Sequence, residues 1–326
     1  MTPAGPLVFG LGATRSFAEG VAAALGVDPA PVEERAFEDG EHKARPLIGV
    51  RDRDCHVLHS LHGDDEQTVN DKLCRLLFFA AALRDHGAAR VTLVCPYLAY
   101  ARKDRRTKAR DPVTSRYVAQ LIEAMGVDRV VVLEPHNAAA FDNALRVPAE
   151  RIHARGPLAD ALLERLDDAP LTVVSPDTGG AKRAAAFRDL LEQRTGSRPA
   201  LAFLEKQRSE GVVTGDSVSG ELEGRTAVVV DDLVAGGTTL SRAAHACLTR
   251  GAVAVHAVVT HAVFASGAER LLGDEALTSL LITDSVGPRL EACWTDRVVR
   301  VSVQPLFARV IHALHDGGSI NEVLDR

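Results

Sequence analysis

Short runs of consecutive apolar residues alternate with amphipathic segments along the whole chain. The runs at residues 130–133 and 227–230 read VVVL and AVVV, so apolar side chains stand at neighbouring positions rather than at every second one. This pattern is typical of strands that are buried on both faces of a parallel sheet. The stretches between such runs, for example residues 16–25 and 239–249, carry apolar residues at helical spacing. The alternation predicts an α/β fold with mostly parallel sheets flanked by helices.

The same order of elements occurs twice, which predicts two tandem domains. Strands are expected at residues 7–10, 56–60, 91–95 and 130–133 in the first half, and at 171–175, 202–204, 227–230, 253–260, 279–283 and 298–301 in the second. A polar stretch with Pro148 and Pro157 separates the halves. The length of 326 residues also fits two domains, at about 150 residues each. We expect one domain at residues 1–149, completed by a C-terminal helix at 305–326, and another at 150–304.

Composition and charge exclude some classes of binding partner for this chain. The formal net charge is −6, so the chain lacks the broad basic surface of a general nucleic-acid-binding protein. Five cysteines are scattered without metal-ligand spacing, which is typical of reduced thiols. The chain begins without a signal-peptide pattern, and no apolar run approaches the roughly 20 residues that span a bilayer. We therefore predict a cytoplasmic protein that binds neither nucleic acid nor membranes.

The clearest candidate chemistry follows the apolar run at 227–230. Two acids, a loop of small residues and two threonines stand there in order. They are Asp231, Asp232, Ala235, Gly236, Gly237, Thr238 and Thr239. Backbone N–H groups of a glycine loop and of a helix N-terminus bind phosphate well, and carboxylates at the carboxyl end of a strand can accept hydrogen bonds from sugar hydroxyls. The stretch predicts a sugar-phosphate site; the alternative is a tight turn whose threonines cap a helix.

A basic segment follows the predicted strand at 91–95. Six Arg and Lys residues surround Asp104 between positions 102 and 110 of an otherwise acidic chain. Such a cluster suits a polyphosphate, for which bidentate Arg is favoured, whereas the alternative is a solvated charged loop. Lys206 and Arg208 are spaced so that both can project from one face of a strand. Read alone, they would be ordinary surface charges.

Taken in order, these motifs resemble those of ribose-phosphate diphosphokinases, also called phosphoribosyl diphosphate synthetases. The segments that carry the resemblance are FEDGE at 37–41, YARKDR at 100–105, EPHN at 134–137, SPDTGG at 175–180, LEKQR at 204–208 and DDLVAGGTT at 231–239. The resemblance implies two tandem phosphoribosyltransferase-like (type I) domains. It also implies an enzyme that moves the β,γ-diphosphate of ATP to the anomeric hydroxyl of ribose 5-phosphate, giving phosphoribosyl diphosphate and AMP, with Mg²⁺ as cofactor.

The resemblance also implies a role for each motif. Ribose 5-phosphate would bind Asp231, Asp232 and the loop 235–239. ATP would bind Phe37, Asp39, Glu41, Arg102, Lys103 and Asp104. His136 and Asp177 would hold Mg²⁺, and Lys206, Arg208 and His136 would be catalytic. Because the family borders the adenine with a loop of a neighbouring subunit, we expect a homo-oligomer, either a dimer or a hexamer.

Five positions depart from the family pattern. Pro135 stands where an apolar residue is usual, and Glu205 where Asp is usual. In addition, Gly236 stands where Thr is usual, Thr238 where the second Gly is usual, and Glu134 where Asp is usual. These departures leave open a non-catalytic homologue that binds and regulates a true synthetase, although the presence of Lys206 and Arg208 favours an enzyme. A phosphoribosyltransferase is a further alternative, but it would need only one α/β domain and no ATP segment.

Overall fold

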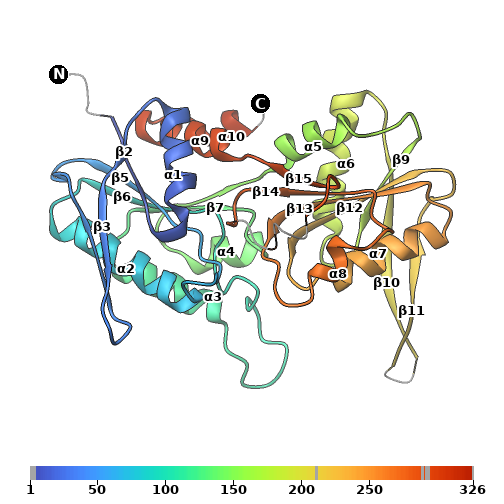
Figure 1. Cartoon of the computed structure of the whole chain (residues 1–326), viewed down its shortest axis with the longest axis horizontal. Coiled ribbons are helices and arrows are strands. Elements are labelled where there is room, and N and C mark those ends of the chain that lie inside the picture. Colours follow the sequence, from blue (N-terminus) through green and yellow to red (C-terminus); the bar gives the residue numbers. More distant parts are fainter. Residues whose placement is uncertain (1–4, 210–211, 288–289, 291–293, 325–326) are drawn as a thin grey trace. The chain divides into compact units, whose positions relative to one another are not determined.

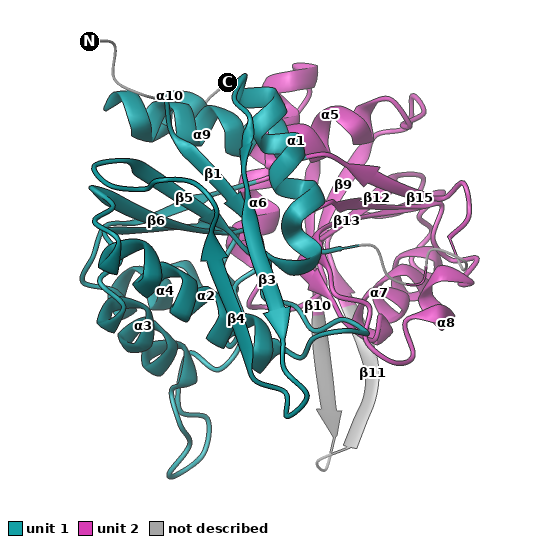
Figure 2. Ribbon diagram, turned by 60° about the vertical axis from the view of Figure 1, so that its left-hand side comes forward, with its two compact units in different colours: residues 1–153, 285–287, 303–326 teal, residues 154–284, 288–302 magenta. Residues whose placement is uncertain are grey.

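The computed structural model describes residues 5–209, 212–287, 290 and 294–324, without the side chains of 205–209 and 212–217. The chain forms two compact units (Figure 2). Unit 1 consists of Met1–His153, Ser285–Gly287 and Val303–Arg326, and unit 2 of Ala154–Asp284 and Pro288–Ser302. Each unit has its own mostly parallel sheet and its own hydrophobic core (Figure 1).

Unit 1 is built on a six-stranded sheet in the order β2-β1-β5-β6-β7-β8, with every neighbouring pair parallel. The strands are β1 Leu7–Gly10, β2 Pro29–Ala30, β5 Asp54–Leu58, β6 Arg90–Cys95, β7 Arg129–Leu133 and β8 Ala149–Ile152. The helices are η1 Gly12–Thr14, α1 Arg15–Leu25, α2 Val69–Asp85, α3 Thr114–Ala124, α4 Ala138–Ala144, α9 Gln304–Asp316 and α10 Ile320–Leu324. An antiparallel hairpin, β3 Val32–Ala36 and β4 His42–Pro46, forms a separate small sheet.

The helix α9, near the end of the chain, packs on unit 1. The rings of Phe17 in α1 and Phe307 in α9 meet edge to face with their centroids 5.5 Å apart. His315 Nδ1 lies 2.7 Å from Asp54 Oδ2 in β5. Burial opposes ionisation of Asp54, but contacts with Arg90, His56 and His315 outweigh it and hold its pKa well below the usual range. An apolar contact and an ionic contact therefore both attach α9 to the sheet.

Unit 2 has a seven-stranded sheet in the order β11-β10-β9-β12-β13-β14-β15, in which only the pair β10–β11 is antiparallel. The strands are β9 Leu171–Ser175, β10 Ala200–Ser209, β11 Val212–Ser219, β12 Thr226–Val234, β13 Ala254–Ala262, β14 Ser279–Thr283 and β15 Val298–Val301. The helices are α5 Arg155–Leu163, α6 Ala181–Thr195, α7 Thr238–Thr249 and α8 Glu269–Leu272. The predicted α/β class with mostly parallel sheets is confirmed.

Both sheets change direction at an equivalent place. In unit 1 the chain adds β2 on one side of β1 and then places β5 on the other side. In unit 2 it adds β10 on one side of β9 and then places β12 on the other. Ligands of open α/β sheets bind outside the carboxyl ends of the strands at such a switch point. The fold therefore offers one candidate position at β1/β5 and another at β9/β12.

Within the described part of the chain, no helix has the length and apolar character needed to cross a membrane. The thiols of Cys55, Cys74, Cys95 and Cys247 are free. Burial raises the pKa of Cys95 to about 12, so this thiol stays protonated and behaves as a core residue.

Candidate functional site

The carboxyl end of β12 brings two acidic side chains to the switch point of unit 2. Asp232 is only 4% exposed, and Asp231 is partly exposed. Arg183, in the first turn of α6, contacts both: Nη1 lies 3.3 Å from Asp231 Oδ1, and Nη2 lies 3.4 Å from Asp232 Oδ1. The Asp232 N–H donates to Asp231 Oδ1 at 2.8 Å. A single guanidinium group thus bridges two neighbouring carboxylates.

The negative charge of this pair is only partly compensated. Burial, and after it the charge of Asp232, raise the pKa of Asp231 to about 7, although Arg183 opposes the shift. Such a pair can accept hydrogen bonds from sugar hydroxyls. It also suits Mg²⁺, which usually binds one or two protein carboxylates together with phosphate oxygens of a substrate. Among the described residues, no three His, Cys, Asp or Glu side chains form a ready-made metal site; Mg²⁺ bound to one or two carboxylates completes its shell with waters and phosphate oxygens.

The loop after β12 has the backbone geometry of an anion site. Gly237 is the N-cap of α7 and has a φ of +80°. A Cβ atom on Gly237 would lie 2.6 Å from Leu271 Cβ, so this position requires glycine for its conformation and for space. Thr238 and Thr239 follow as the first residues of α7 and are exposed. Neither threonine is the cap, which removes the alternative of a turn with a Thr cap and leaves the N–H groups of the first turn for another acceptor.

Gly236 differs from Gly237 in its surroundings. The nearest atom to a Cβ built on Gly236 is the Ser266 carbonyl oxygen at 3.7 Å, an ordinary contact distance. The family's usual Thr would therefore fit here without a clash. Its replacement by glycine removes one hydroxyl from the loop and leaves the backbone path of the loop intact.

Asp177 lies at the same sheet edge, just after β9, the strand that neighbours β12. Its Oδ1 accepts a hydrogen bond from the Gly180 N–H at 2.9 Å, and its carbonyl oxygen accepts one from Ser175 Oγ at 2.6 Å. Asp177 therefore shapes the turn that leads into α6. Its side chain is exposed, and its second carboxylate oxygen is not used by these two bonds.

The backbones of Lys206 and Arg208 belong to β10 and pair with Asp216 and Val213 of β11. The register shifts between Gln207 and Arg208, which pair with Gly215 and Val213, so the extra residue of this irregularity lies in β11, opposite the two predicted catalytic residues. The side chains of Lys206 and Arg208 lie outside the described residues, and their role stays a prediction.

In unit 1, the loops after β6 and β7 bring the expected ATP segment beside the expected metal ligand. Asn137 Nδ2 donates to Asp104 Oδ2 at 2.5 Å, while Asn137 Oδ1 caps α4 through the Ala140 N–H. This bond fixes the residue next to His136 against the basic segment. Glu134, two residues before His136, has a φ of +36°. Strained backbone of this kind is frequent at functional sites.

Within the basic segment, one carboxylate oxygen organises the loop. Asp111 Oδ2 accepts hydrogen bonds from Lys103 Nζ at 2.5 Å, Thr107 N at 3.0 Å, Thr107 Oγ1 at 2.8 Å and Lys108 N at 2.9 Å. These donors, with the bond from Lys103 making the largest contribution, hold the pKa of Asp111 well below its usual range. Lys103 is thus an internal brace of the loop, while Arg102 beside it is exposed.

The remaining predicted ATP residues lie at the tip of the β3–β4 hairpin. Asp39 Oδ1 accepts a hydrogen bond from the Glu41 N–H at 3.0 Å, and the guanidinium group of Arg35 lies 5.0 Å from the centre of the Phe37 ring. Asp39 and Glu41 are exposed. Figure 2 shows the hairpin as a separate arm of unit 1. This arm brings Phe37, Asp39 and Glu41 together, apart from the strand ends of the same unit.

Three residues of these sites had no role in the prediction from sequence: Arg183, Asn137 and Asp111. Arg183 contacts an aspartate 48 positions further along the chain, so only the return of the chain to the same sheet edge reveals the contact. Its place three residues after Gly180, in the first turn of a helix that leaves a strand end, was the available signal. Asn137 stood in the EPHN motif, and Asp111 ended the basic segment.

Comparison with family models assigns both halves of the chain. Residues 7–126 match the N-terminal domain of ribose phosphate pyrophosphokinase. Residues 202–325 match the phosphoribosyl synthetase-associated domain. The first match lies within unit 1, and the second covers unit 2 from β10 onward together with the C-terminal helices α9 and α10 of unit 1.

Individual relatives are similar over nearly the full length. The ribose-phosphate pyrophosphokinase of Maricaulis maris is 34% identical over 290 residues, which are 89% of this chain and 90% of the relative. That of Gloeobacter violaceus is 34% identical over 321 residues, 97% of this chain and 92% of the relative. The crystal structure of phosphoribosylpyrophosphate synthetase from Mycobacterium smegmatis has a TM-score of 0.87 at 29% identity, and the match covers 97% of this chain and 100% of that one.

The raised pKa of Asp231 predicts how stability depends on pH. Because the pKa of about 7 in the folded chain lies above the unfolded value of about 4, the contribution of Asp231 to stability is complete below pH 4 and is lost as the pH rises through 7. Asp231→Asn, which is always neutral, should be more stable than wild type at pH 8 by at most about 4 kcal/mol, the equivalent of three pKa units. This advantage should shrink toward pH 4. Urea unfolding of both proteins at several pH values measures the difference, and a pH-independent difference would contradict the assignment.

Proposed function

The chain belongs to the ribose-phosphate pyrophosphokinase family, and we propose that it is a ribose-phosphate diphosphokinase that converts ATP and ribose 5-phosphate into phosphoribosyl diphosphate and AMP. The observation that carries this proposal is the similarity over both units, 34% identity across 97% of the chain. The acid pair and glycine loop at the switch point of unit 2 agree with it.

Ribose 5-phosphate is assigned to unit 2. Its phosphate would accept hydrogen bonds from the N–H groups of residues 236–239, where the dipole of α7 favours an anion. Its ring hydroxyls would donate to Asp231 and Asp232. Arg183 holds these two carboxylates in place, so a bound sugar must share them with its guanidinium group. The high pKa of Asp231 means that hydroxyl donors meet a carboxylate whose charge the protein leaves under-compensated.

Magnesium fits the same acid pair, because Asp231 and Asp232 supply oxygen ligands and a phosphate completes the shell. When bound, the ion neutralises phosphate charge and orients the diphosphate. His136 and Asp177 stay the predicted magnesium ligands, each at a strand end of its own unit. The exposed His136 side chain and the second carboxylate oxygen of Asp177 are consistent with this role.

ATP is assigned to the basic segment after β6, with Arg102, Lys103 and Asp104 near its phosphates, and to Phe37, Asp39 and Glu41 on the hairpin. The protein's task in this reaction is to position the reactants and neutralise charge. The anomeric oxygen forms a bond to the β-phosphorus of ATP while the bond from that phosphorus to the α–β bridging oxygen breaks. AMP leaves with the bridging oxygen, and the hydroxyl proton is released. Lys206 and Arg208 would stabilise the charge on the diphosphate during transfer.

The exposed surface of unit 1 supports the proposal of a homo-oligomer. Two large apolar side chains are exposed here: Leu47, in the loop after β4, is 52% accessible, and Phe78, in α2, is 59% accessible. His42 of β4 stacks on Phe78 with ring centroids 5.7 Å apart, so Phe78 and His42 form one patch beside the hairpin. Apolar patches of this kind mark protein interfaces. We propose a homo-oligomer, a dimer or hexamer, that uses this patch; the cytoplasmic location stays a prediction.

The proposal is tested by measuring AMP release from ATP in magnesium buffer, with and without ribose 5-phosphate. We expect release that depends on the sugar. Lys206→Ala should lower kcat by about 10²–10³ with a modest change in the KM for ATP. Arg198→Ala is the control, because Arg198 lies beyond the C-terminal end of α6 with its side chain 56% exposed. No AMP from the folded chain would favour the non-catalytic homologue, and near-normal kcat in Lys206→Ala would remove Lys206 from the mechanism.

The ion pair between Lys103 and Asp111 leads to a separate prediction. If Lys103 serves ATP binding by shaping the loop through Asp111, then Lys103→Met and Asp111→Asn should each raise the KM for ATP by a similar factor, roughly tenfold, with little change in kcat. The double variant should be no worse than either single variant, since the two residues act through one interaction. Multiplying effects in the double variant would show instead that Lys103 contacts the nucleotide directly.

A further inference from the structure

The switch point of unit 1 has the same topology as that of unit 2 but a different content. In unit 2 the strand end at β12 carries two acids and is followed by a glycine loop. In unit 1 the corresponding strand, β5, is followed by His59 and Ser60 instead. The residues that surround this second crevice take no part in the proposed reaction, and they include several buried charged side chains.

One carboxylate fills the end of this crevice beside β1. Glu34, in β3, places Oε2 2.9 Å from the Gly12 N–H and 3.0 Å from Arg15 Nη2. Its Oε1 lies 2.9 Å from Arg75 Nη1. The side chain of Glu34 is 10% exposed and that of Arg75 is 9% exposed. A backbone N–H at a strand-to-helix turn and two guanidinium groups are the donors that proteins use to bind phosphate.

The Gly12 N–H and the guanidinium groups of Arg15 and Arg75 form a cradle around the Glu34 carboxylate. Two further details indicate that this cradle suits an anion. Gly12 has a φ of +51°, a backbone conformation that favours glycine, and in this conformation it presents its N–H to Glu34. Arg75 Nε is buried and has no hydrogen-bond partner among the described residues. The cradle therefore has more donor capacity than one carboxylate uses, whereas a tetrahedral oxyanion offers additional acceptors.

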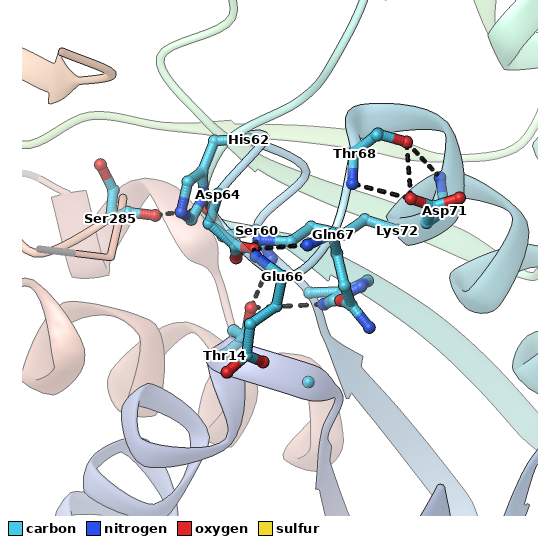
Figure 3. Close-up of polar contacts among 12 residues, drawn as sticks. Thr14, Ser60, His62, Asp64, Glu66, Gln67, Thr68, Asp71, Lys72 and Ser285 are labelled. Atoms are coloured by element: carbon cyan, nitrogen blue, oxygen red, sulfur yellow. Dashed lines mark hydrogen bonds and ion pairs between the residues drawn. The ribbon is translucent and has the colours of Figure 1, made fainter. Parts of the chain in front are cut away.

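In unit 1, hydrogen-bonded side chains occupy the region beside the cradle that corresponds to the proposed sugar site of unit 2. Thr14 Oγ1, from the β1 side, accepts a hydrogen bond from the Ser60 N–H at 2.9 Å and lies 3.3 Å from His59 Nδ1, from the β5 side. Burial, and after it the charge of Lys72, lower the pKa of His59 to about 3, so this ring is neutral at pH 7. Figure 3 shows Thr14 beside Ser60, and Asp64 near the fully buried Lys72; Asp64 Oδ2 and Lys72 Nζ are 2.5 Å apart.

We propose that unit 1 contains a second oxyanion site at its switch point and that the Glu34 carboxylate is its resident ligand. The site arises from the same strand arrangement as the phosphate loop of unit 2. Glu34 keeps it shut, so that the chain accepts a sugar phosphate in unit 2 alone. Because Glu34 belongs to β3, the same contacts also anchor the base of the hairpin that carries Phe37, Asp39 and Glu41.

The test removes the resident carboxylate and supplies inorganic phosphate. Glu34→Ala should bind one more equivalent of phosphate per chain than wild type in isothermal titration. Phosphate should raise its unfolding midpoint by about 4 °C more than that of wild type. Glu34→Gln is the matched control, because its side chain still fills the cradle and should add no equivalent. Glu34→Ala combined with Arg75→Met should lose the additional equivalent, since the second change removes a main donor.

Sodium chloride at equal ionic strength separates a specific oxyanion site from screening of the exposed cations. Equal stoichiometry in wild type and Glu34→Ala, or equal stabilisation by chloride, would overturn the proposal. If Glu34→Ala is recovered unfolded, its refolding yield is the readout: phosphate and acetate should restore folded protein and chloride should not, and equal yields in the three salts would contradict the site. These readouts are binding and folding, so they are independent of whether the chain catalyses diphosphate transfer.

Discussion

The burial of parallel strands on both faces decides where this chain can place polar groups. The strand β12 is apolar from Ala227 to Val230, because an unpaired polar side chain inside the sheet would be costly to bury; Asp232, which is 4% exposed, is paired with Arg183. Val230 is 3% exposed, and the acidic pair begins at the next residue. The same constraint puts Asp177 after β9, His136 after β7 and the basic segment after β6. The polar and charged side chains that can bind ligands therefore lie at one edge of each sheet, and the switch point marks the crevice in that edge.

In these crevices, charged side chains of the protein occupy positions where the charged groups of a ligand could bind. Arg183 bridges the acid pair of unit 2, Asp111 gathers the donors of the basic segment, and Glu34 lies in the cradle of unit 1. The three cases differ in how completely neighbouring groups compensate the negative charge of the carboxylates. The pKa of Asp231 is raised, with Asp232 as its neighbour, so that site favours added hydroxyl donors or a cation. Glu34 is held by two guanidinium groups and a backbone N–H, which is why we regard unit 1 as closed.

The apolar runs of the sequence were sufficient to predict the α/β class and the central strands. The run at 130–133 lies within β7 Arg129–Leu133, and the run at 227–230 lies within β12 Thr226–Val234. The hairpin β3–β4 was missed because VEERA and HKARP contain no apolar run and pair only with each other. The ordered motifs identified the family, which the comparisons confirm. Arg183 and Glu34 were missed because their contacts join segments that only folding brings together.

From the contents of the two switch points we expect the two units to offer a single open sugar-phosphate site in total, although their topology is the same. Isothermal titration of the wild-type chain with ribose 5-phosphate in magnesium buffer counts these sites. We expect one equivalent bound per chain, in unit 2. Two equivalents per chain would contradict the closure of unit 1, and none would contradict the assignment of the acid pair and glycine loop.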